Sequence, residues 1–169
     1  MMKKYNLYFL LALFVISGCQ KAVNKENEEK VLVFNVANQV ELSEFGKLKL
    51  DESHLNLLNP KISKDSFEVV YKSWTDLHQN LHGYLVENNF DWGVADEKIK
   101  ILNRIYFKKN GKVKTYVYRV YNKITDEKAK EYGELMKGFL REEQISLTRG
   151  MDFAQCGKMS LPNIKKQKL

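Results

Sequence analysis

The sequence predicts a single domain of the α+β class, in which a small antiparallel sheet with a β-hairpin packs against two amphipathic helices. Two apolar stripes with helical spacing, in residues 63–88 and 126–144, predict the helices. Between them, residues 98–121 alternate apolar and polar side chains on both sides of an Asn-Gly pair, which predicts the hairpin. The domain spans residues 31–162, which is long enough to bury a proper core.

The first third of the domain has the weakest pattern. Residues 31–36 form a short run rich in β-branched and aromatic side chains, which favours a strand. From residue 38 to residue 60, apolar residues recur without a clear period. We therefore expect short helical turns and loops between the first strand and the first long helix.

The first long helix is predicted by apolar residues at three- and four-residue steps, which lie on one helical face. These residues are Phe67, Val70, Tyr71, Trp74, Leu77, Leu81, Tyr84 and Leu85. Ser63 or Ser66 is placed to cap the start, and Ile62 is placed to act as a hydrophobic staple. The Asn88-Asn89 pair indicates the end.

The hairpin follows at residue 98. On the first strand, lysine and arginine alternate with the apolar residues Ile99, Ile101, Ile105 and Phe107. The Asn110-Gly111 pair favours a type I′ turn, because both residues tolerate positive φ. The second strand carries apolar residues on both faces, with Val113, Val117 and Tyr121 continuing the first face and Tyr116, Tyr118 and Val120 on the opposite one. We expect one face to pack on a helix and the other on a different part of the chain.

The second helix and a last strand complete the domain. Thr125 is placed as the cap of a helix over residues 126–144. Asp126 and Glu127 lie in its first turn, where negative charges stabilise the positive end of the helix dipole. Its apolar face comprises Ala129, Tyr132, Leu135, Met136, Phe139 and Leu140. Residues 151–161 are expected to return as a strand that ends at Pro162.

The order hairpin, helix, returning strand resembles the C-terminal domain of TonB-type energy transducers. Residues 105–113 and 117–120 match the opening strands and the glycine turn, and residues 155–162 fall where the last strand and its proline lie. The Trp-x-Pro-Gly-like element of that family is replaced by Leu147-Thr148-Arg149-Gly150, and its Pro-rich spanner is missing. The resemblance implies the fold and binding of a partner segment at a strand edge, not energy transduction.

The first nineteen residues combine a basic start with an apolar run. Lys3 and Lys4 precede residues 5–16, a run too short to span a membrane but typical of a signal peptide. Ile16-Ser17-Gly18-Cys19 resembles the lipobox of bacterial lipoproteins. The resemblance implies that residues 1–18 are removed and that Cys19 carries the lipid. An ordinary secretory signal with a chance cysteine, or an uncleaved anchor, are the alternatives.

The polar segments at both ends of the domain complete this organisation. Residues 19–30 comprise the lipidated cysteine and a polar tether that cannot bury enough surface to fold, and residues 163–169 form a basic, solvated tail. Lipidation predicts attachment to the cell membrane or the outer membrane, with the domain facing the periplasm or the cell surface. The formal net charge is +7, but basic residues are scattered among acids, so we expect no nucleic-acid partner.

His78 and His82 are the candidate metal ligands. Histidines at i and i+4 on a helix can hold one Zn²⁺ from the same face, as in His-Glu-x-x-His proteases. Here Gln79 replaces the glutamate that would act as general base, and only His54 or a carboxylate could add a third ligand. A packed histidine beside a surface histidine is the structural alternative.

The second hairpin strand holds the candidate binding residues Tyr116, Tyr118, Arg119 and Tyr121. Tyrosine and arginine are enriched at interface anchors, so an exposed strip of these residues would favour a protein partner. Burial of the tyrosines under the long helix is the alternative, because tyrosine also suits half-buried strands.

The remaining chemistry-bearing features are few. With Cys19 lipidated, Cys156 has no partner in the chain, and it is either a buried structural thiol or a reactive, intermolecular one. The sequence contains no phosphate loop or nucleophile motif that spacing supports, and it indicates no cofactor. We therefore expect a non-catalytic binding or scaffold protein of the envelope with an unidentified protein partner. A zinc-dependent protein using His78 and His82 is the alternative.

Overall fold

The computed structural model describes residues 30–164. The predicted signal segment, the lipidation residue Cys19 and nearly all of the predicted tether lie outside the described residues, as does the basic tail from residue 165. Between residues 30 and 164, no helix is both long enough and apolar enough to cross a membrane.

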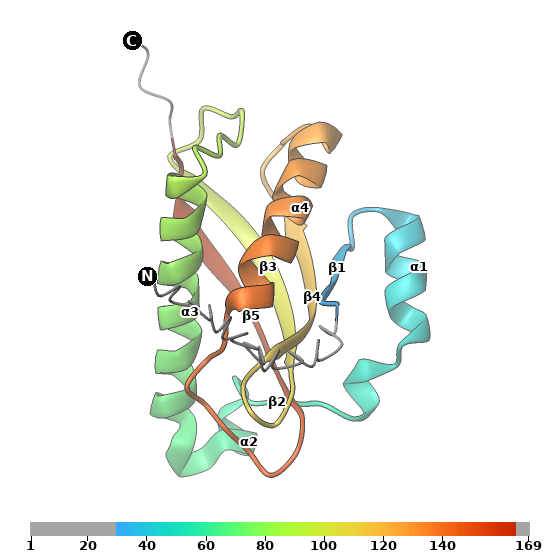
Figure 1. Ribbon diagram of the computed structural model, residues 1–169, viewed down its shortest axis with the longest axis vertical. Coiled ribbons are helices and arrows are strands. Elements are labelled where there is room, and N and C mark those ends of the chain that lie inside the picture. The colour runs from blue at the N-terminus through green and yellow to red at the C-terminus, as the bar shows by residue number, and fades with distance from the viewer. Residues whose placement is uncertain (1–29, 165–169) are drawn as a thin grey trace, which may run out of the picture.

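A single five-stranded sheet forms the centre of the described domain (Figure 1). In chain order the strands are β1 (Leu32–Asn35), β2 (Leu55–Asn56), β3 (Lys98–Phe107), β4 (Val113–Val120) and β5 (Phe153–Pro162). Their order across the sheet is β1-β4-β3-β5-β2. Together with the helices that pack on it, this sheet confirms the predicted α+β class.

The sheet is mixed rather than fully antiparallel. β3 runs antiparallel to β4 and β5, as predicted, whereas β1 pairs in parallel with β4 and β2 pairs in parallel with β5. Parallel neighbours need a long connection, and here each edge strand is separated from its partner by at least one long helix. With four and two residues, β1 and β2 are too short for their direction to be indicated by the sequence.

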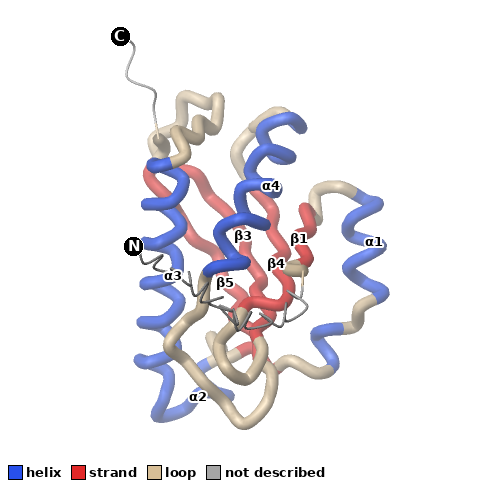
Figure 2. The backbone as a smooth tube through the Cα atoms, in the orientation of Figure 1, coloured by secondary structure: helices blue, strands red, loops and turns tan. Residues whose placement is uncertain are grey.

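The described residues also form four α-helices. They are α1 (Gln39–Lys47), α2 (Pro60–Ser63), α3 (Phe67–Glu87) and α4 (Asp126–Glu142), with 3₁₀ turns at Leu50–Glu52 and Lys64–Ser66. The two longest, α3 and α4, cross the same face of the sheet (Figures 1 and 2). They correspond to the two predicted amphipathic helices, and Thr125 caps α4 as expected by accepting a hydrogen bond from Lys128 N.

The start of α3 differs from the prediction. The helix begins at Phe67, because a short helix and a 3₁₀ turn come first. The Ser66 hydroxyl donates to the Ser63 carbonyl (2.8 Å), and the Ser63 hydroxyl donates to the Leu57 carbonyl. Neither serine accepts a hydrogen bond from the first turn of α3, so the predicted side-chain cap is wrong. The end at Glu87 agrees with the predicted stop.

β3 and β4 form the predicted hairpin, but its turn is not type I′. In the loop only Gly111 has a positive φ (+86°), whereas type I′ needs two such residues. Gly111 N donates to the Lys108 carbonyl and Lys108 N donates to the Lys112 carbonyl, each at 2.9 Å, which defines a three-residue loop. A Cβ at Gly111 would collide with the Ile145 carbonyl oxygen, so the close loop after α4 also requires glycine here.

The side-chain faces of β4 also differ from the prediction. Lys114 has no partner in the register with β3, and this bulge inverts the alternation after Val113. Tyr116 therefore lies opposite Ile105 and faces the helices, whereas Val117 faces the opposite side of the sheet. The predicted assignment of the two faces was wrong because a single extra residue exchanges them.

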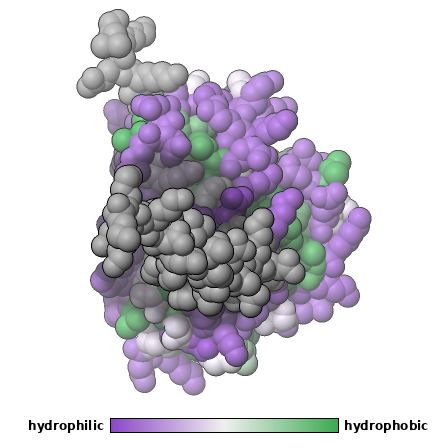
Figure 3. Space-filling view, viewed as in Figure 1, coloured by the Kyte–Doolittle hydropathy of each residue, from purple (hydrophilic) through white to green (hydrophobic). Residues whose placement is uncertain are grey.

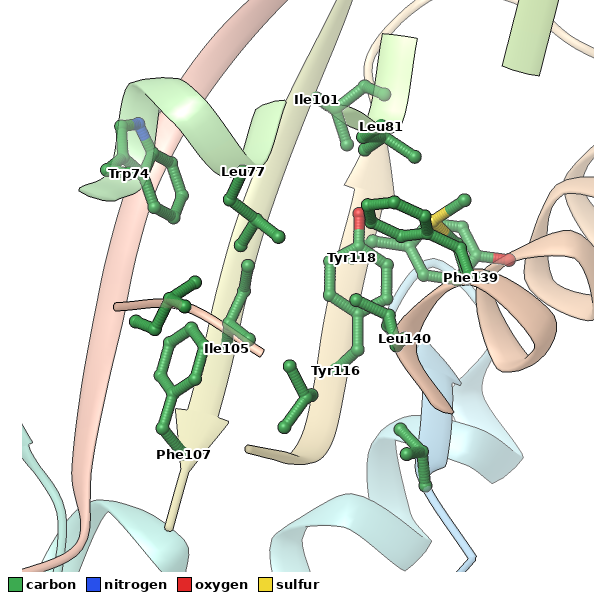
Figure 4. Close-up of a cluster of buried hydrophobic side chains, with 14 of the residues drawn as sticks. Trp74, Leu77, Leu81, Ile101, Ile105, Phe107, Tyr116, Tyr118, Phe139 and Leu140 are labelled. Atoms are coloured by element: carbon green, nitrogen blue, oxygen red, sulfur yellow. The ribbon is translucent and has the colours of Figure 1, made fainter. Parts of the chain in front are cut away.

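The main core lies between the sheet and the two long helices. Figure 4 shows side chains from α3, β3, β4 and α4 that point toward one another, namely Trp74, Leu77, Leu81, Ile101, Ile105, Phe107, Tyr116, Tyr118, Phe139 and Leu140. All of the predicted apolar residues of β3 are among the buried residues. The helix-covered face of the sheet is thus the face that the sequence pattern of β3 predicted.

A smaller core lies on the opposite side of the sheet, which we call the second face. Phe45 of α1 packs its ring against Phe34 and Tyr106, with centroids 6.0 and 5.9 Å apart. Leu50 and Val117 belong to the same cluster. This cluster is the separate packing partner expected for the second side of β4.

α1 is a nine-residue helix where only short turns and loops were expected. The side chain of Asn38 caps it by accepting hydrogen bonds from Val40 N and Glu41 N. None of its residues is fully buried, and Val40 is 68% exposed. Figure 3 shows hydrophobic atoms on the side of the molecule where α1 lies, among mostly hydrophilic residues.

Candidate functional site

A groove of about 510 Å³ runs between α3 and the outer side of β5. One side is formed by the α3 residues Tyr71, Trp74, Thr75, His78, Gln79 and His82, and the other by residues 158–162 of β5. Gly157 permits the close approach of helix and strand, because a Cβ there would lie 3.2 Å from the ring of Trp74. The groove therefore combines an aromatic helix face with a length of strand.

The strand in this groove has an unpaired edge. Within residues 30–164, β2 pairs only with Phe153 and Ala154, and Asn56 Oδ1 then accepts from Cys156 N at 3.0 Å. Because backbone groups alternate between the two sides of an antiparallel strand, Lys158 and Ser160 direct their N–H and C=O groups away from β3. No strand among the described residues pairs with these groups.

The opposite edge of the sheet is protected. A larger groove of about 720 Å³ lies there between α1, β1 and α4. However, the outward N–H of Asn35 donates to Glu41 Oε2 at 2.7 Å, so a side chain of α1 already occupies the edge of β1. An inward-turned charge is a common way of blocking a strand edge. The edge of β5 is therefore the better site for a further strand.

His78 lies beneath the groove in a closed hydrogen-bond network. Its Nδ1 donates to the Trp74 carbonyl at 2.6 Å, and its Nε2 accepts from Asn103 Nδ2 at 3.3 Å. Asn103 Oδ1 in turn accepts from the hydroxyl of Tyr116, which accepts from Tyr132 at 2.7 Å. Burial lowers the pKa of His78 to about 4, and the hydrogen bond to Trp74 offsets only part of that effect. The ring is therefore neutral at physiological pH.

His82 lies one turn along α3 and is half-buried in the same groove. Both ring nitrogens of His78 already have partners inside the domain, so His78 has no free lone pair for a metal. Across residues 30–164, no three histidine, cysteine, aspartate or glutamate side chains form a group that could hold a metal ion. The arrangement of the two histidines is that of a packed histidine beside a half-exposed one.

The predicted strip on β4 is divided by the structure. Tyr116 and Tyr118 are 1% and 2% exposed, and the Tyr118 hydroxyl donates to the Ala129 carbonyl at 2.7 Å. An exposed strip that includes these tyrosines is therefore wrong, because the bulge turns them toward α4. Arg119 and Tyr121 remain exposed on the second face.

Cys156 is half-buried on the second face and forms no disulfide within residues 30–164. It lies beside Arg104, its partner in the register between β5 and β3. Burial by itself would lower the pKa of Arg104. The contacts with Cys156 and Tyr106 raise it by more, so the pKa lies above its usual value. Asp51 accepts from both Arg104 (2.5 Å) and the Tyr106 hydroxyl (2.6 Å), which completes a compact polar cluster.

The sequence predicted the two parts of the groove but not that they lie side by side. It predicted the helix that carries both histidines and the strand over residues 151–161. Strand order is not encoded in the alternation pattern, which is the same for a central and an edge strand. The one available signal was Pro162, because proline in sheets is confined to strand ends, bulges and edges.

No protein-family model matches the chain, and no curated protein or solved structure matches it.

Proposed function

We propose that this protein is a lipid-anchored, non-catalytic protein of the bacterial cell envelope whose domain binds an extended segment of a partner protein along the outer edge of β5. The lipid on Cys19 attaches the chain to the cell membrane or the outer membrane, and the domain faces the periplasm or the cell surface. The binding mode is β-augmentation, in which the partner adds a strand to the sheet.

The observation that carries this proposal is an unpaired strand edge within a groove. The outward N–H and C=O groups of Lys158 and Ser160 offer main-chain hydrogen bonds to a partner. The side of α3 that carries Tyr71 and Trp74 offers side-chain contacts to the same partner. In β-augmentation, main-chain bonds give affinity and such side-chain pockets give specificity.

The chemistry of the two sides defines the partner segment. Along an added strand, alternate side chains point to opposite faces of the sheet. On the helix-covered face they meet Trp74, Met159 and Leu161, whereas on the second face they meet Lys158 and Ser160. The partner segment therefore alternates apolar residues with polar or acidic ones over about five positions.

The anchor is supported by the lipobox-like residues 16–19. We expect Cys19→Ser to lose the mass of the lipid and to leave the membrane fraction, because the acyl chains provide the anchoring free energy. Fractionation and mass spectrometry of the purified protein test this. A Cys19→Ser protein that stays in the membrane with an unchanged lipid mass would contradict the anchor.

Peptide selection tests the strand edge. The chain from residue 20 retains every described element and both cores, and it is used to select binders from a displayed library of random peptides. Ser160→Pro removes the outward N–H, whereas Ser160→Ala keeps it and removes only the hydroxyl. We expect the selected peptide to bind Ser160→Ala nearly as well as wild type and Ser160→Pro at least about tenfold more weakly.

Near-ultraviolet circular dichroism reports whether each variant keeps its tertiary packing. A folded Ser160→Pro protein that binds the peptide as tightly as Ser160→Ala would contradict binding at this edge. So would a library that yields no binder of the wild-type protein. Should Ser160→Pro fail to fold, amide exchange in the wild-type complex gives the same decision.

A further inference from the structure

The part of the second face around Lys100 and Leu102 of β3, which we call its upper half, has no covering element in the described domain. α1 and the 3₁₀ turn after it cover only the lower half, around Tyr106 and Val117. Above them, Leu102 lies between Arg119 and Lys158 in neighbouring strands, and Lys100 lies in the next row. Apart from the half-buried Leu102, these side chains are exposed, so three adjacent strands present them to solvent.

This open area is strongly basic. At its lower end Arg104 is paired with Asp51, with Arg104 Nη1 and Asp51 Oδ2 separated by 2.5 Å. Among the described residues, no carboxylate lies within ion-pair distance of the other cations, which are Lys98, Lys100, Arg119 and Lys158. Most other lysine ion pairs lie on the helices, where they are local to one helix. The area therefore keeps four uncompensated positive charges.

An aromatic ring lies among these charges. Tyr121 is 47% exposed, and two cations lie over its ring, with Lys158 Nζ 5.5 Å and Arg119 Cζ 5.8 Å from the centroid. Lys158 comes from β5 and Arg119 from β4, so the ring lies across β3 and joins the three strands. Tyrosine combines an apolar ring with a polar hydroxyl, and it is enriched at the boundary between water and lipid.

We propose that this basic face, formed by Lys98, Lys100, Leu102, Arg119, Tyr121 and Lys158, binds the anionic phospholipid headgroups of the membrane to which the protein is attached. The inference rests on the proposed anchor at Cys19. Eleven residues separate Cys19 from the domain, and they reach roughly 35 Å when extended, so the face stays close to the bilayer. Four free cations complement a negatively charged surface, and each one near such a surface adds affinity.

A bilayer is favoured over an acidic protein segment by the form of the face. The cations are distributed over three strands of an open sheet, which matches a plane of headgroups. The groove beside β5 instead follows a single strand and suits a peptide. The two surfaces meet at Lys158, with the partner segment along the strand edge and the lipid over Lys98, Lys100, Arg119 and Tyr121 of the second face.

Vesicle binding tests the proposal without the anchor. The chain from residue 20 is mixed with vesicles of phosphatidylcholine containing 30% phosphatidylglycerol, and with pure phosphatidylcholine vesicles as a reference. We expect Lys100→Gln with Arg119→Gln to bind the anionic vesicles roughly 30-fold more weakly, since each basic residue near the surface contributes roughly fivefold. Lys72→Gln with Lys130→Gln, on the helices of the other face, removes the same charge and is expected to change binding by less than about twofold.

Three outcomes would overturn the proposal: equal weakening by the two double variants, equal binding of wild type to both kinds of vesicle, or binding to poly-glutamate without binding to anionic vesicles. The last outcome would assign the face to an acidic protein instead. Neither Lys100 nor Arg119 lines the groove beside β5, so peptide binding at that edge is measured in the same variants. Failure of vesicle binding with intact peptide binding therefore separates this proposal from the proposed function.

Discussion

His78 links the groove to the core of the domain. Its ring is tilted by 59° to that of Trp74, with centroids 4.0 Å apart. Its Nε2 connects α3 to Asn103 on β3, whereas its Nδ1 donates to a carbonyl of α3 itself. Because both nitrogens are satisfied only in the neutral tautomer, protonation would replace an acceptor by a donor facing Asn103 Nδ2. The residue is therefore a structural element whose contribution depends on pH.

Acidification is expected to destabilise the fold through His78. The unfolded chain takes up a proton near pH 6.5, whereas the pKa of the folded residue is about 4. The stability that the neutral residue provides is complete above pH 6.5 and is lost progressively as the pH falls toward 4, by up to about 3 kcal/mol. Urea unfolding at pH 7 and pH 4.5 measures this, and His78→Gln is expected to reduce the difference between the two pH values.

His82→Gln is the matched control, because His82 is on the same helix and has no hydrogen-bond partner among the described residues. It should retain the pH dependence of the wild type. If His78→Gln and His82→Gln show the same pH dependence, the assignment of this effect to the buried ring is wrong.

At the scale of the element, α1 is a helix with few packing contacts. It buries no residue completely and reaches the second face through Phe45, which contacts Phe34 and Tyr106. A helix of nine residues is not stable alone, so its order depends on that contact. Its Glu41 also blocks the edge of β1, which means that the position of α1 determines which edges are open.

Phe45→Ala is expected to release α1 from the sheet without unfolding the main core. Amide exchange should become at least about tenfold faster throughout residues 39–47 and stay unchanged in α4, because Phe45 belongs only to the smaller cluster. Val40→Ala, at a 68% exposed position, should leave exchange unaltered. If Phe45→Ala speeds exchange in α4 as well as in α1, the two cores are not independent.

The elements differ in how far the sequence could predict them. α3, α4 and the hairpin were predicted because each has a sustained period of apolar residues. α1 and β2 were not, since α1 has only Phe45 as a packed residue and β2 has two residues. The bulge at Lys114 left no mark in the alternation, although it decided that Tyr116 is buried.

At the scale of the whole molecule, a single sheet contributes two faces and one open edge, and each has different surroundings. Its helix-covered face carries the two long helices and the main core. Its second face is covered in one half and basic in the other, and its β5 edge is open beside α3. Composition predicted a basic protein, but which charges gather on one face follows from the strand order β4-β3-β5, which no local pattern encodes. The candidate site was predictable as separate elements and not as an arrangement.

Amide exchange in the complex with a selected peptide is the most direct test of the central claim, the binding of an extended segment at the edge of β5. The outward N–H groups of Lys158 and Ser160 have no partner within the described domain, so they are expected to exchange rapidly in the free protein. We predict that the bound peptide slows exchange at one or both of these amides by at least about tenfold. Unchanged exchange at both amides, with protection elsewhere on the domain, would contradict it.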